Sequence, residues 1–488
     1  MSIPKALAFA LLLFALTASA SAGSIWYVKP PGSLGGSGPG SGSSWGQAVA
    51  LDAALTASVS GDEIRIAEGV YNPTVNYVPG STDPRDRSFL INKSLTLIGG
   101  WLGNEIGHTP PQGCPALTVL DASPAGFACD GPFHVVSITG APGAKIALSR
   151  VRIQHGWASA SLAPCAGPTL PGGLDPRNNG AGMYIKSRST VALSEIIFAD
   201  NNGLGLGGGL YANGCSLSMD QTVMVRNVAN GTPDGGGSAM YLNCPIARLA
   251  NVVVHANGNS TARGGGLYAA GGDMEFTNCV FTGNDATGGS GGAMYLEGDV
   301  YARLFNCTLS SNHASATGAE SIDMSTLAGE CLLFNTVVFS NALAVPHFIA
   351  PPVVGQFQSA SCYLQILAGQ PGPSADSSAA GFPTIYFPPA LGAPLVNIFY
   401  APGGFSLDPL TNVAVTTKGD PALVPADIFD LDKDGNTTEQ VGMDRERSPR
   451  FTVLAAGTTV SMGAYEIPYP LTGQSLGLTY YLNVPCYP

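Results

Sequence analysis

Acidic residues alternate near the C-terminal end of the chain in a pattern that suits a divalent cation. Alternating carboxylates direct oxygen atoms to a common centre, and Gly435 permits the turn that a calcium loop needs. The pattern differs from an EF-hand loop, because its twelfth position is Val441 and its glutamate stands at the tenth. The sequence predicts a structural calcium site, with a solvated acidic turn as the alternative. Its expected ligands are Asp430, Asp432, Asp434, Asn436 and Glu439.

Residues that could cleave a glycosidic bond do not form a recognisable catalytic motif. Two carboxylates must lie close in space, and only two pairs come into question, Asp273 with Asp299 and Asp200 with Asp285. The six histidines are scattered, and we expect them on the surface or in turns. A calcium-assisted lyase would need a carboxylate and basic residues, and one segment near the C-terminal end supplies them: Asp444, Arg445, Arg447 and Arg450. We expect these residues to form ion pairs that hold the end of the domain together. The sequence therefore assigns no catalytic residue, and it favours a non-enzymatic role without deciding the question.

The composition argues against a nucleic-acid partner. The formal net charge is −12, charged residues make up 11%, and no basic run occurs. Such a chain offers no electrostatic footprint for nucleic acid. The low charge, with 64 glycines and 37 prolines, favours a turn-rich, all-β protein.

The first 22 residues have the features of a secretory signal peptide. Lys5 precedes an apolar run from Ala6 to Leu16, and small residues follow. No later stretch reaches 18 uninterrupted apolar residues, so no transmembrane segment is expected after signal removal. We expect a secreted or cell-surface protein of the bacterial cell envelope.

A repeat of about 27 residues runs through the middle of the chain and would position the side chains within it. Each unit has a tyrosine after a glycine-rich turn, and the successive spacings are 27, 30, 27 and 27. The tyrosines are Tyr184, Tyr211, Tyr241, Tyr268 and Tyr295. A second apolar segment in each unit ends in an asparagine: Asn201, Asn227, Asn257, Asn284, Asn312 and Asn341.

One such unit is too short to bury its own apolar face, so the units must stack. The sequence predicts a right-handed parallel β-helix rather than a β-sandwich or propeller, with an N-terminal cap and a C-terminal loop-rich region. Stacking predicts an asparagine amide ladder and a tyrosine row. It also predicts an inward row formed by Phe198, Val225, Val254, Phe281 and Leu309.

Ten cysteines fit an oxidising compartment, and their even number permits full pairing. The disulfide candidates are Cys279 with Cys307, Cys215 with Cys244, and Cys114 with Cys129, and buried free thiols are the alternative. Cys279 lies 11 residues after Tyr268, but Cys307 lies 12 after Tyr295, so alignment on the tyrosines offsets the two cysteines by one residue. An asparagine directly precedes each cysteine, and alignment on these asparagines places the cysteines opposite each other at a spacing of 28. We expect the asparagine register, which stacks the two residues.

Several motifs resemble those of a known family. Gly291-Gly292-Ala293-Met294, Phe198-Ala199-Asp200-Asn201 and Phe281-Thr282-Gly283-Asn284 resemble the repeats of polymorphic outer membrane proteins, which are adhesin-like. The segment from Gly61 to Tyr71 resembles the start of secreted bacterial β-helix proteins. Gly463-Ala464-Tyr465-Glu466 resembles part of the choice-of-anchor Q domain.

These observations predict a domain order. It is a signal peptide at 1–22, a cap with the first strand at 23–75, the β-helix at 76–345, Pro/Gly-rich loops or terminal coils at 346–418, and an anchor-like region at 419–488. The expected function is a non-enzymatic adhesin or scaffold that binds a polysaccharide or a cell-surface partner. The alternative is a carbohydrate-active enzyme, either a polysaccharide lyase or a glycoside hydrolase.

Overall fold

The computed structural model describes most of the chain between residues 23 and 459. The described residues are 23–33, 40–105, 117–123, 131–140, 142–158, 176–230, 235–258, 263–315, 317–339, 348–349, 356–365, 375–376, 385–387, 398–401, 404–407, 420–428, 436–441, 452–454 and 457–459. The predicted signal peptide, Asp430, Asp432, Asp434, Cys114, Cys129, Asn341 and the segment from Asp444 to Arg450 lie outside them.

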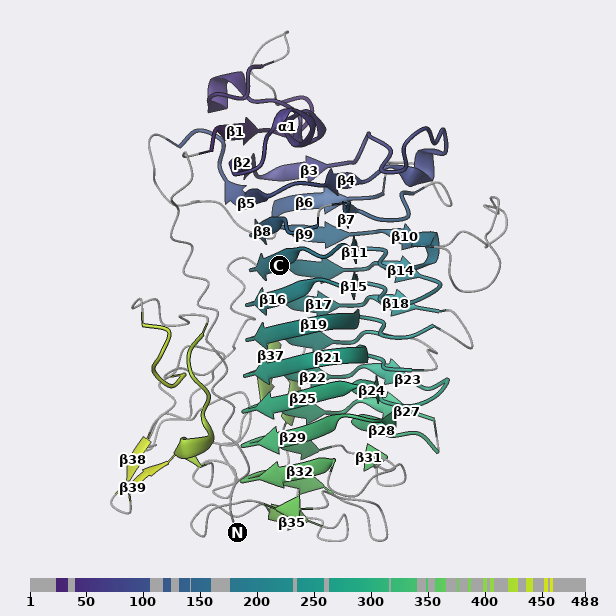
Figure 1. The fold of residues 1–488 in the computed structure, drawn as a ribbon, viewed down its shortest axis with the longest axis vertical. Coiled ribbons are helices and arrows are strands. Elements are labelled where there is room, and N and C mark those ends of the chain that lie inside the picture. Colours follow the sequence, from purple (N-terminus) through teal and green to yellow (C-terminus); the bar gives the residue numbers. More distant parts are fainter. Residues whose placement is uncertain are drawn as a thin grey trace.

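The chain winds into a right-handed parallel β-helix, as its repeat predicts (Figure 1). A 19-stranded sheet forms two adjoining columns, and an 11-stranded sheet, here called sheet B, forms the third. We call the columns A1 and A2 in the order in which each coil passes through them. They count as one sheet because β19 (Met240–Ala250) and β21 (Leu267–Thr277) run through both.

The remaining strands of each column follow in chain order. A1 holds β4 (Phe89–Ile91), β7 (Val136–Thr139), β11 (Met183–Lys186), β15 (Leu210–Asn213), β24 (Met294–Gly298), β28 (Ile322–Leu327) and β31 (Phe348–Ile349). A2 holds β1 (Ile25–Val28), β2 (Asp62–Ala67), β5 (Leu95–Trp101), β8 (Lys145–Ser149), β12 (Thr190–Ser194), β16 (Ser216–Asp220), β25 (Val300–Phe305), β29 (Glu330–Phe334), β32 (Phe357–Ala360) and β34 (Ala375–Asp376).

Sheet B and the smaller elements complete the structure. Sheet B holds β3 (Gly69–Tyr71), β6 (Thr118–Asp121), β9 (Arg152–Gln154), β13 (Ile197–Ala199), β17 (Val223–Val225), β20 (Val253–His255), β22 (Val280–Thr282), β26 (Thr308–Ser310), β30 (Val337–Phe339), β33 (Tyr363–Gln365) and β35 (Ile385–Phe387). Short pairings join β10 (Trp157–Ala158), β14 (Asn202–Gly203) and β18 (Val228–Ala229), and β23 (Asp285–Ala286) with β27 (His313–Ala314). Antiparallel hairpins join β36 (Ile398–Ala401) with β37 (Gly404–Leu407), and β38 (Thr452–Leu454) with β39 (Gly457–Thr459).

Helices are few among the described residues. The α-helix α1 (Leu51–Ala57) lies at the N-terminal end of the solenoid and buries Leu51, Ala54 and Leu55 (Figure 1). The 3-10 helices are η1 (Trp45–Gln47), η2 (Pro84–Asp86), η4 (Pro176–Asn178) and η5 (Pro421–Leu423). The position of α1 agrees with a cap over the open end of the first coil.

Sheet B is bounded on both sides by corners with positive φ, which keeps all of its strands except β6 three residues long. The corner before sheet B has φ between 46° and 60° at Arg150, Glu195, Gln221, Asn251, Asn278, Asn306, Asn335 and Ser361. Asparagine tolerates this left-handed conformation better than most residues, so its recurrence here has a conformational cause. The glycine before each buried tyrosine has the same role: at Gly291, with φ +73°, a Cβ would lie 2.4 Å from the carbonyl oxygen of Met294.

The predicted asparagine ladder is present over its described residues. The amide Nδ2 of Asn201 donates to Asn227 Oδ1 at 2.9 Å, Asn227 to Asn257 at 3.0 Å, Asn257 to Asn284 at 3.0 Å and Asn284 to Asn312 at 2.9 Å. The five tyrosines also form the predicted row, with ring centroids 5.0–5.4 Å apart. The rings of Tyr184, Tyr211 and Tyr241 stack, whereas Tyr268 meets Tyr241 and Tyr295 edge to face. His134 extends this row by stacking on Tyr184 at 4.8 Å.

The predicted inward row of sheet B is correct except at one residue. Val254 pairs with Met224 and Phe281, whereas Val225 pairs with His255 on the opposite face of the strand. The inward residue always lies three positions before the ladder asparagine, and Met224 satisfies that spacing. The assignment of Val225 to this row rested on its residue type. One step along a strand moves a side chain to the opposite face, so Met224 and not Val225 points inward.

Both candidate registers for Cys279 and Cys307 occur, in different parts of the same coil. Tyr268 pairs with Tyr295 at a spacing of 27, but Thr277 pairs with Phe305 at a spacing of 28. The bend between A1 and A2 takes up the extra residue. Val280 also pairs with Thr308, so the residues flanking the cysteines follow the asparagine register.

Candidate functional site

The outer face of sheet B is closed to a ligand over β13, β17, β20 and β22. Ile197, Val223, Val253 and Val280 point away from the solenoid interior, yet each is at most 2% exposed. Buried residues on both faces explain the continuous apolar runs in these strands. The exposed polar groups of the described residues therefore have to be sought at the corners and on column A2.

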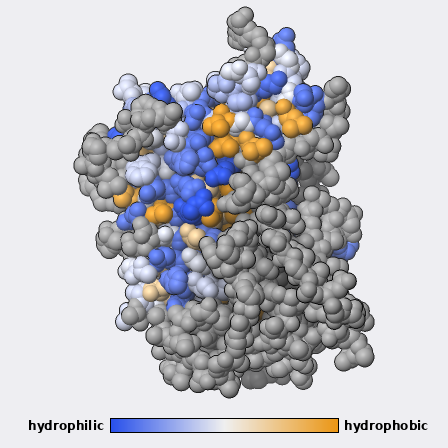
Figure 2. Space-filling model, turned by 180° about the vertical axis from the view of Figure 1, so that it is seen from behind, coloured by the Kyte–Doolittle hydropathy of each residue, from blue (hydrophilic) through white to orange (hydrophobic). Residues whose placement is uncertain are grey.

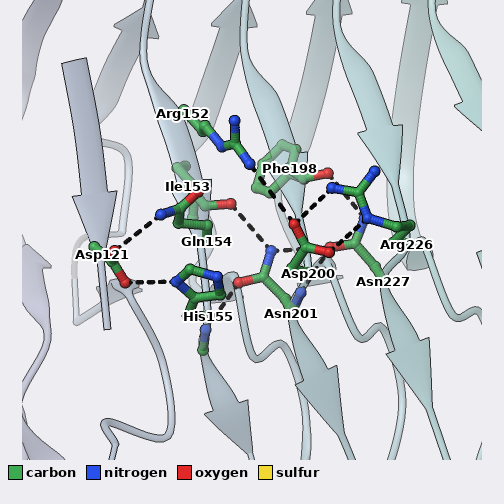
Figure 3. Close-up of polar contacts among 11 residues, drawn as sticks. Asp121, Arg152, Ile153, Gln154, His155, Phe198, Asp200, Asn201, Arg226 and Asn227 are labelled. Carbon is green, nitrogen blue, oxygen red and sulfur yellow. Dashed lines mark hydrogen bonds and ion pairs between the residues drawn. The ribbon is translucent and has the colours of Figure 1, made fainter. Parts of the chain in front are cut away.

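One polar cluster surrounds the corner that follows sheet B at its N-terminal strands (Figure 3). Its members come from β6, from β9, and from the turns after β9, β13 and β17. We call it the B corner cluster: Asp121, Arg152, Gln154, His155, Asp200 and Arg226.

A histidine–carboxylate pair forms the first half of the B corner cluster. His155 Nδ1 donates to Asp121 Oδ1 at 2.9 Å, and Gln154 Nε2 donates to Asp121 Oδ2 at 2.9 Å. The hydrogen bond to Asp121 raises the pKa of His155, although partial burial opposes this. Burial also opposes ionisation of Asp121, but the hydrogen bonds from His155, Gln154 and the Ser123 N–H outweigh it and lower the pKa of Asp121.

Two arginines flank a shared carboxylate in the second half of the B corner cluster. Arg226 donates to both oxygens of Asp200, at 2.7 and 2.8 Å, and Arg152 NH2 lies 3.6 Å from Asp200 Oδ2. The Arg226 side chain is 52% exposed and His155 is 42% exposed, so a ligand can reach both. Chemically, this cluster offers one accessible imidazole and one exposed guanidinium group, that of Arg226, whereas Arg152 is largely buried.

A second polar cluster lies on the outer face of A2 and crosses three successive coils. We call it the A2 patch: Ile246, Arg248, Asp273, Glu275, Tyr301 and Arg303. Arg248, Glu275 and Arg303 are direct cross-strand partners on β19, β21 and β25. Two residues earlier on the same strands, a second row of cross-strand partners is formed by Ile246, Asp273 and Tyr301.

Each carboxylate of the A2 patch lies between two guanidinium groups. Asp273 is 3.2 Å from Arg248 and 2.7 Å from Arg303. Glu275 is 3.9 Å from Arg248 and 3.7 Å from Arg303. Tyr301 is 49% exposed and Ile246 is 46% exposed, so an aromatic ring and an aliphatic side chain lie open beside this charged group. The patch thus combines a flat apolar contact with fixed donors and acceptors.

The proposed carboxylate pairs do not form in the structure. Asp273 pairs with Tyr301 rather than Asp299, and Asp285 pairs with His313 rather than lying beside Asp200. Both pairs were assigned by coil spacing, but their members occupy different positions within the coil. The expectation of surface or turn histidines is also wrong at two sites, since His134 is fully buried and His255 is 7% exposed.

The calcium prediction is untested, because three of its five ligands lie outside the described residues. Of the other two, Asn436 Nδ2 donates to Glu439 Oε2 at 3.1 Å, and Asn436 is exposed while Glu439 is half-buried. Within the described part of the chain, no group of three or more His, Cys, Asp or Glu residues is arranged to hold a metal ion.

The cysteine candidates can be placed in part. Cys215 Sγ lies 3.4 Å from Cys244 Sγ, and both residues are buried. Cys279 and Cys307 are buried thiols, and their sulfur atoms contact the carbonyl oxygens of Leu249 and Phe276. Disulfide bonding at either pair remains a prediction.

Sequence reasoning did not find either polar cluster. Asp121 and His155 are 34 residues apart in an enlarged coil, away from the regular 27-residue part. The A2 patch follows no sequence motif, because its residues meet only when three coils stack. The sole signal was the alternation of polar residues along β19, β21 and β25.

No family model matches this chain. A segment of 86 residues is 31% identical to the probable autotransporter YfaL of Escherichia coli strain K12, covering 16% of this chain and 7% of that protein. The chain therefore matches less than a tenth of that relative's length.

Solved structures give similarity at low sequence identity. Pectate lyase Pel9A has a TM-score of 0.43 at 14% identity, covering 92% of this chain and 97% of that one. The pectin methylesterase of Aspergillus niger has a TM-score of 0.28 at 15% identity, covering 76% of this chain and 85% of that one. The described residues contain no helix long and apolar enough to cross a membrane.

Proposed function

We propose that this chain is a secreted or cell-surface β-helix protein that binds a polysaccharide along column A2 without cleaving it. The observation that carries the proposal is an exposed Tyr301 beside paired arginines and carboxylates on three adjacent coils. The local similarity to a probable autotransporter, together with the signal-like N-terminus, supports a place in the cell envelope.

The chemistry of the A2 patch suits a hydroxyl-rich polymer. A tyrosine ring gives a pyranose face a flat apolar surface at little entropic cost. The guanidinium groups donate in a fixed planar geometry to hydroxyl or carboxylate oxygens, and the carboxylates accept from hydroxyl groups. Coils repeat about every 4.8 Å, so a polymer lying across them meets Arg248, Glu275 and Arg303 at regular intervals.

The binding experiment uses the full chain with a panel of neutral and uronate-containing polysaccharides, measured by calorimetry or affinity electrophoresis. We expect one class to bind, and Tyr301→Ala to weaken that binding about tenfold, from loss of roughly 1.4 kcal/mol of stacking and burial. Val70→Ala on β3 is the matched control, because Val70 is 50% exposed outside the patch. Equal binding by Tyr301→Ala and the unsubstituted protein would remove the A2 patch from the proposal.

A carbohydrate-active enzyme is the second candidate, and the His155–Asp121 pair favours it. An accessible histidine held by a carboxylate beside arginines has the residue types that proton abstraction from a uronate needs. Incubation with the same panel would detect unsaturated or reducing ends. Product release that disappears in His155→Gln would establish the enzyme, whereas binding without product supports the scaffold.

A further inference from the structure

The thiols of Cys215 and Cys244 come from neighbouring coils and meet inside the described solenoid. Their sulfur atoms are 3.4 Å apart, and the residues are 0% and 1% exposed. Cys215 stands between β15 and β16, and Cys244 lies within β19 of the next coil. Adjacent coils lie within the Cα separation that a disulfide spans, about 4.4–6.8 Å.

The backbone of β19 is irregular beside Cys244 on the side that faces the following coil. Pro245 follows Cys244 and has no N–H to donate to the neighbouring coil. On the next coil, β19 and β21 change register between Asn243 and Ile246. Gly272 there packs so closely that a Cβ would lie 1.7 Å from the Cys244 carbonyl oxygen. These irregularities lie between the Cys244 coil and the coil after it. The coils of Cys215 and Cys244 keep a constant offset of 30 residues on both sides of the thiols, from Asn213 with Asn243 to Ser216 with Ile246, and this register holds the two thiols side by side.

We propose that Cys215 and Cys244 form a disulfide that clasps two successive coils. The bond forms by exchange with a disulfide-bearing oxidant. One cysteine thiolate attacks the oxidant and releases one of its sulfurs as a thiol, and the second cysteine thiolate then displaces the other sulfur. Two S–H bonds are lost, one S–S bond forms in the chain, and the oxidant is reduced to a dithiol.

The burial of both sulfurs fixes when this exchange occurs. An oxidant cannot reach a side chain that is 0% exposed, so the bond forms as the coils close during folding rather than on the finished protein. Cys279 provides a contrast within the same solenoid, because its Sγ atom contacts the carbonyl oxygens of Leu249 and Thr277. For Cys279 we therefore expect a buried free thiol, the alternative to a disulfide with Cys307.

The test is a peptide map of the full chain exported by a bacterial host. The protein is unfolded in alkylating reagent without reductant and then digested. We expect one cross-linked species joining the Cys215 and Cys244 peptides, while the Cys279 peptide carries the alkyl group. Alkylation of both Cys215 and Cys244 in the exported protein would overturn the proposal.

A second measurement keeps the stability claim separate from the bond itself. Reductant should lower the melting temperature of the exported protein by a few degrees, because the cross-link restricts the unfolded chain. The Cys215→Ala/Cys244→Ala variant should show no response to reductant, and Cys279→Ser should respond like the unsubstituted protein. An equal response in the double variant would contradict a clasp at this position. The proposal shares with the proposed function only the requirement for export, and these readouts do not depend on polysaccharide binding.

Discussion

At the scale of single residues, the asparagine ladder replaces the backbone partners that a tight corner leaves without a hydrogen bond. Asn257 donates to the carbonyl oxygens of Met224 and His255 and to Asn284. It accepts from the backbone N–H and the side chain of Asn227. Asn257 thus connects three coils inside a buried turn.

Substitution of Asn257 by alanine should lower the free energy of unfolding by about 3 kcal/mol or more, because several buried polar groups lose their partners. Asn213→Ala is the control, because its amide donates only to the Tyr211 hydroxyl at a half-buried site, and it should cost less than about 1 kcal/mol. Chemical denaturation measures both. Equal losses would show that the ladder adds no stability of its own.

The face on which Val254 lies decides a second prediction. Val254 is fully buried between Met224 and Phe281, so Val254→Asp places a carboxylate in the core without a partner. We expect insoluble protein, or a loss above about 4 kcal/mol. Val70→Asp, at a 50% exposed strand position, should fold normally. A soluble Val254→Asp protein with an unchanged melting temperature would contradict this assignment.

At the scale of elements, the corner before sheet B connects the solenoid to a distant segment. Asn335 Nδ2 donates to the Asp420 carbonyl oxygen at 2.9 Å, and the Asp420 N–H donates to Asn335 Oδ1 at 2.8 Å. One coil earlier, both side-chain amide atoms of Asn306 are buried without a hydrogen-bond partner among the described residues. Two asparagines with the same backbone conformation therefore have different roles.

Asn335→Ala should speed amide hydrogen exchange across residues 420–428 while leaving the strands of sheet B unchanged, because it removes the two-point link to Asp420. Asn306→Gly is the matched substitution. It suits a φ of +51° and removes a buried polar group that has no partner, so exchange at 420–428 should not change. Fast exchange in both variants would mean that the link to Asp420 does not hold the segment.

At the scale of the whole molecule, two buried histidines predict the response to acid. Burial lowers the pKa values of His134 and His255 to about 4, although hydrogen bonds to backbone carbonyls oppose the shift. Between pH 6.5 and 4 the unfolded chain therefore binds more protons than the folded chain. Stability should fall with decreasing pH by about 1.4 kcal/mol per pH unit for each histidine.

His155 does not offset this loss in the same pH range. Its pKa is raised in the folded protein, so its stabilisation is complete below its unfolded value and is lost as the pH rises through the folded value. Urea denaturation at pH 7.5, 6 and 5 would measure the trend, and His134→Phe should reduce the slope while keeping an aromatic ring beside Tyr184. A stability that does not change over this range would contradict the prediction.

Calcium binding would also act on the whole molecule, by fixing the C-terminal region. If the acidic loop binds calcium, a chelator should lower the melting temperature by a few degrees, and Asp432→Ala should abolish that sensitivity. Asp299→Ala, outside the loop, should leave the effect of the chelator on the melting temperature unchanged. An identical melting temperature with and without chelator would remove the metal from this region.

Local sequence was enough to determine the repeating architecture. The tyrosine and asparagine spacings predicted stacked parallel coils, an amide ladder and a tyrosine row, because like residues lie above one another when units of constant length stack. The same reasoning failed at Val225 and at the pairing of Asp273 with Asp299. A strand reverses its faces at every residue, so an error of one position in a three-residue strand exchanges inside for outside.

The tertiary structure alone decided where the polar groups meet and which surfaces stay open. Asp121 and His155 come together across an enlarged coil, and the A2 patch needs three coils in register. The sequence also gave no sign that Ile197 and Val253, which point outward, would be buried. Period and residue type specify the position of a side chain within one coil. Its neighbours and its solvent exposure depend on the register between coils and on what covers each face, and neither is a local property of the chain.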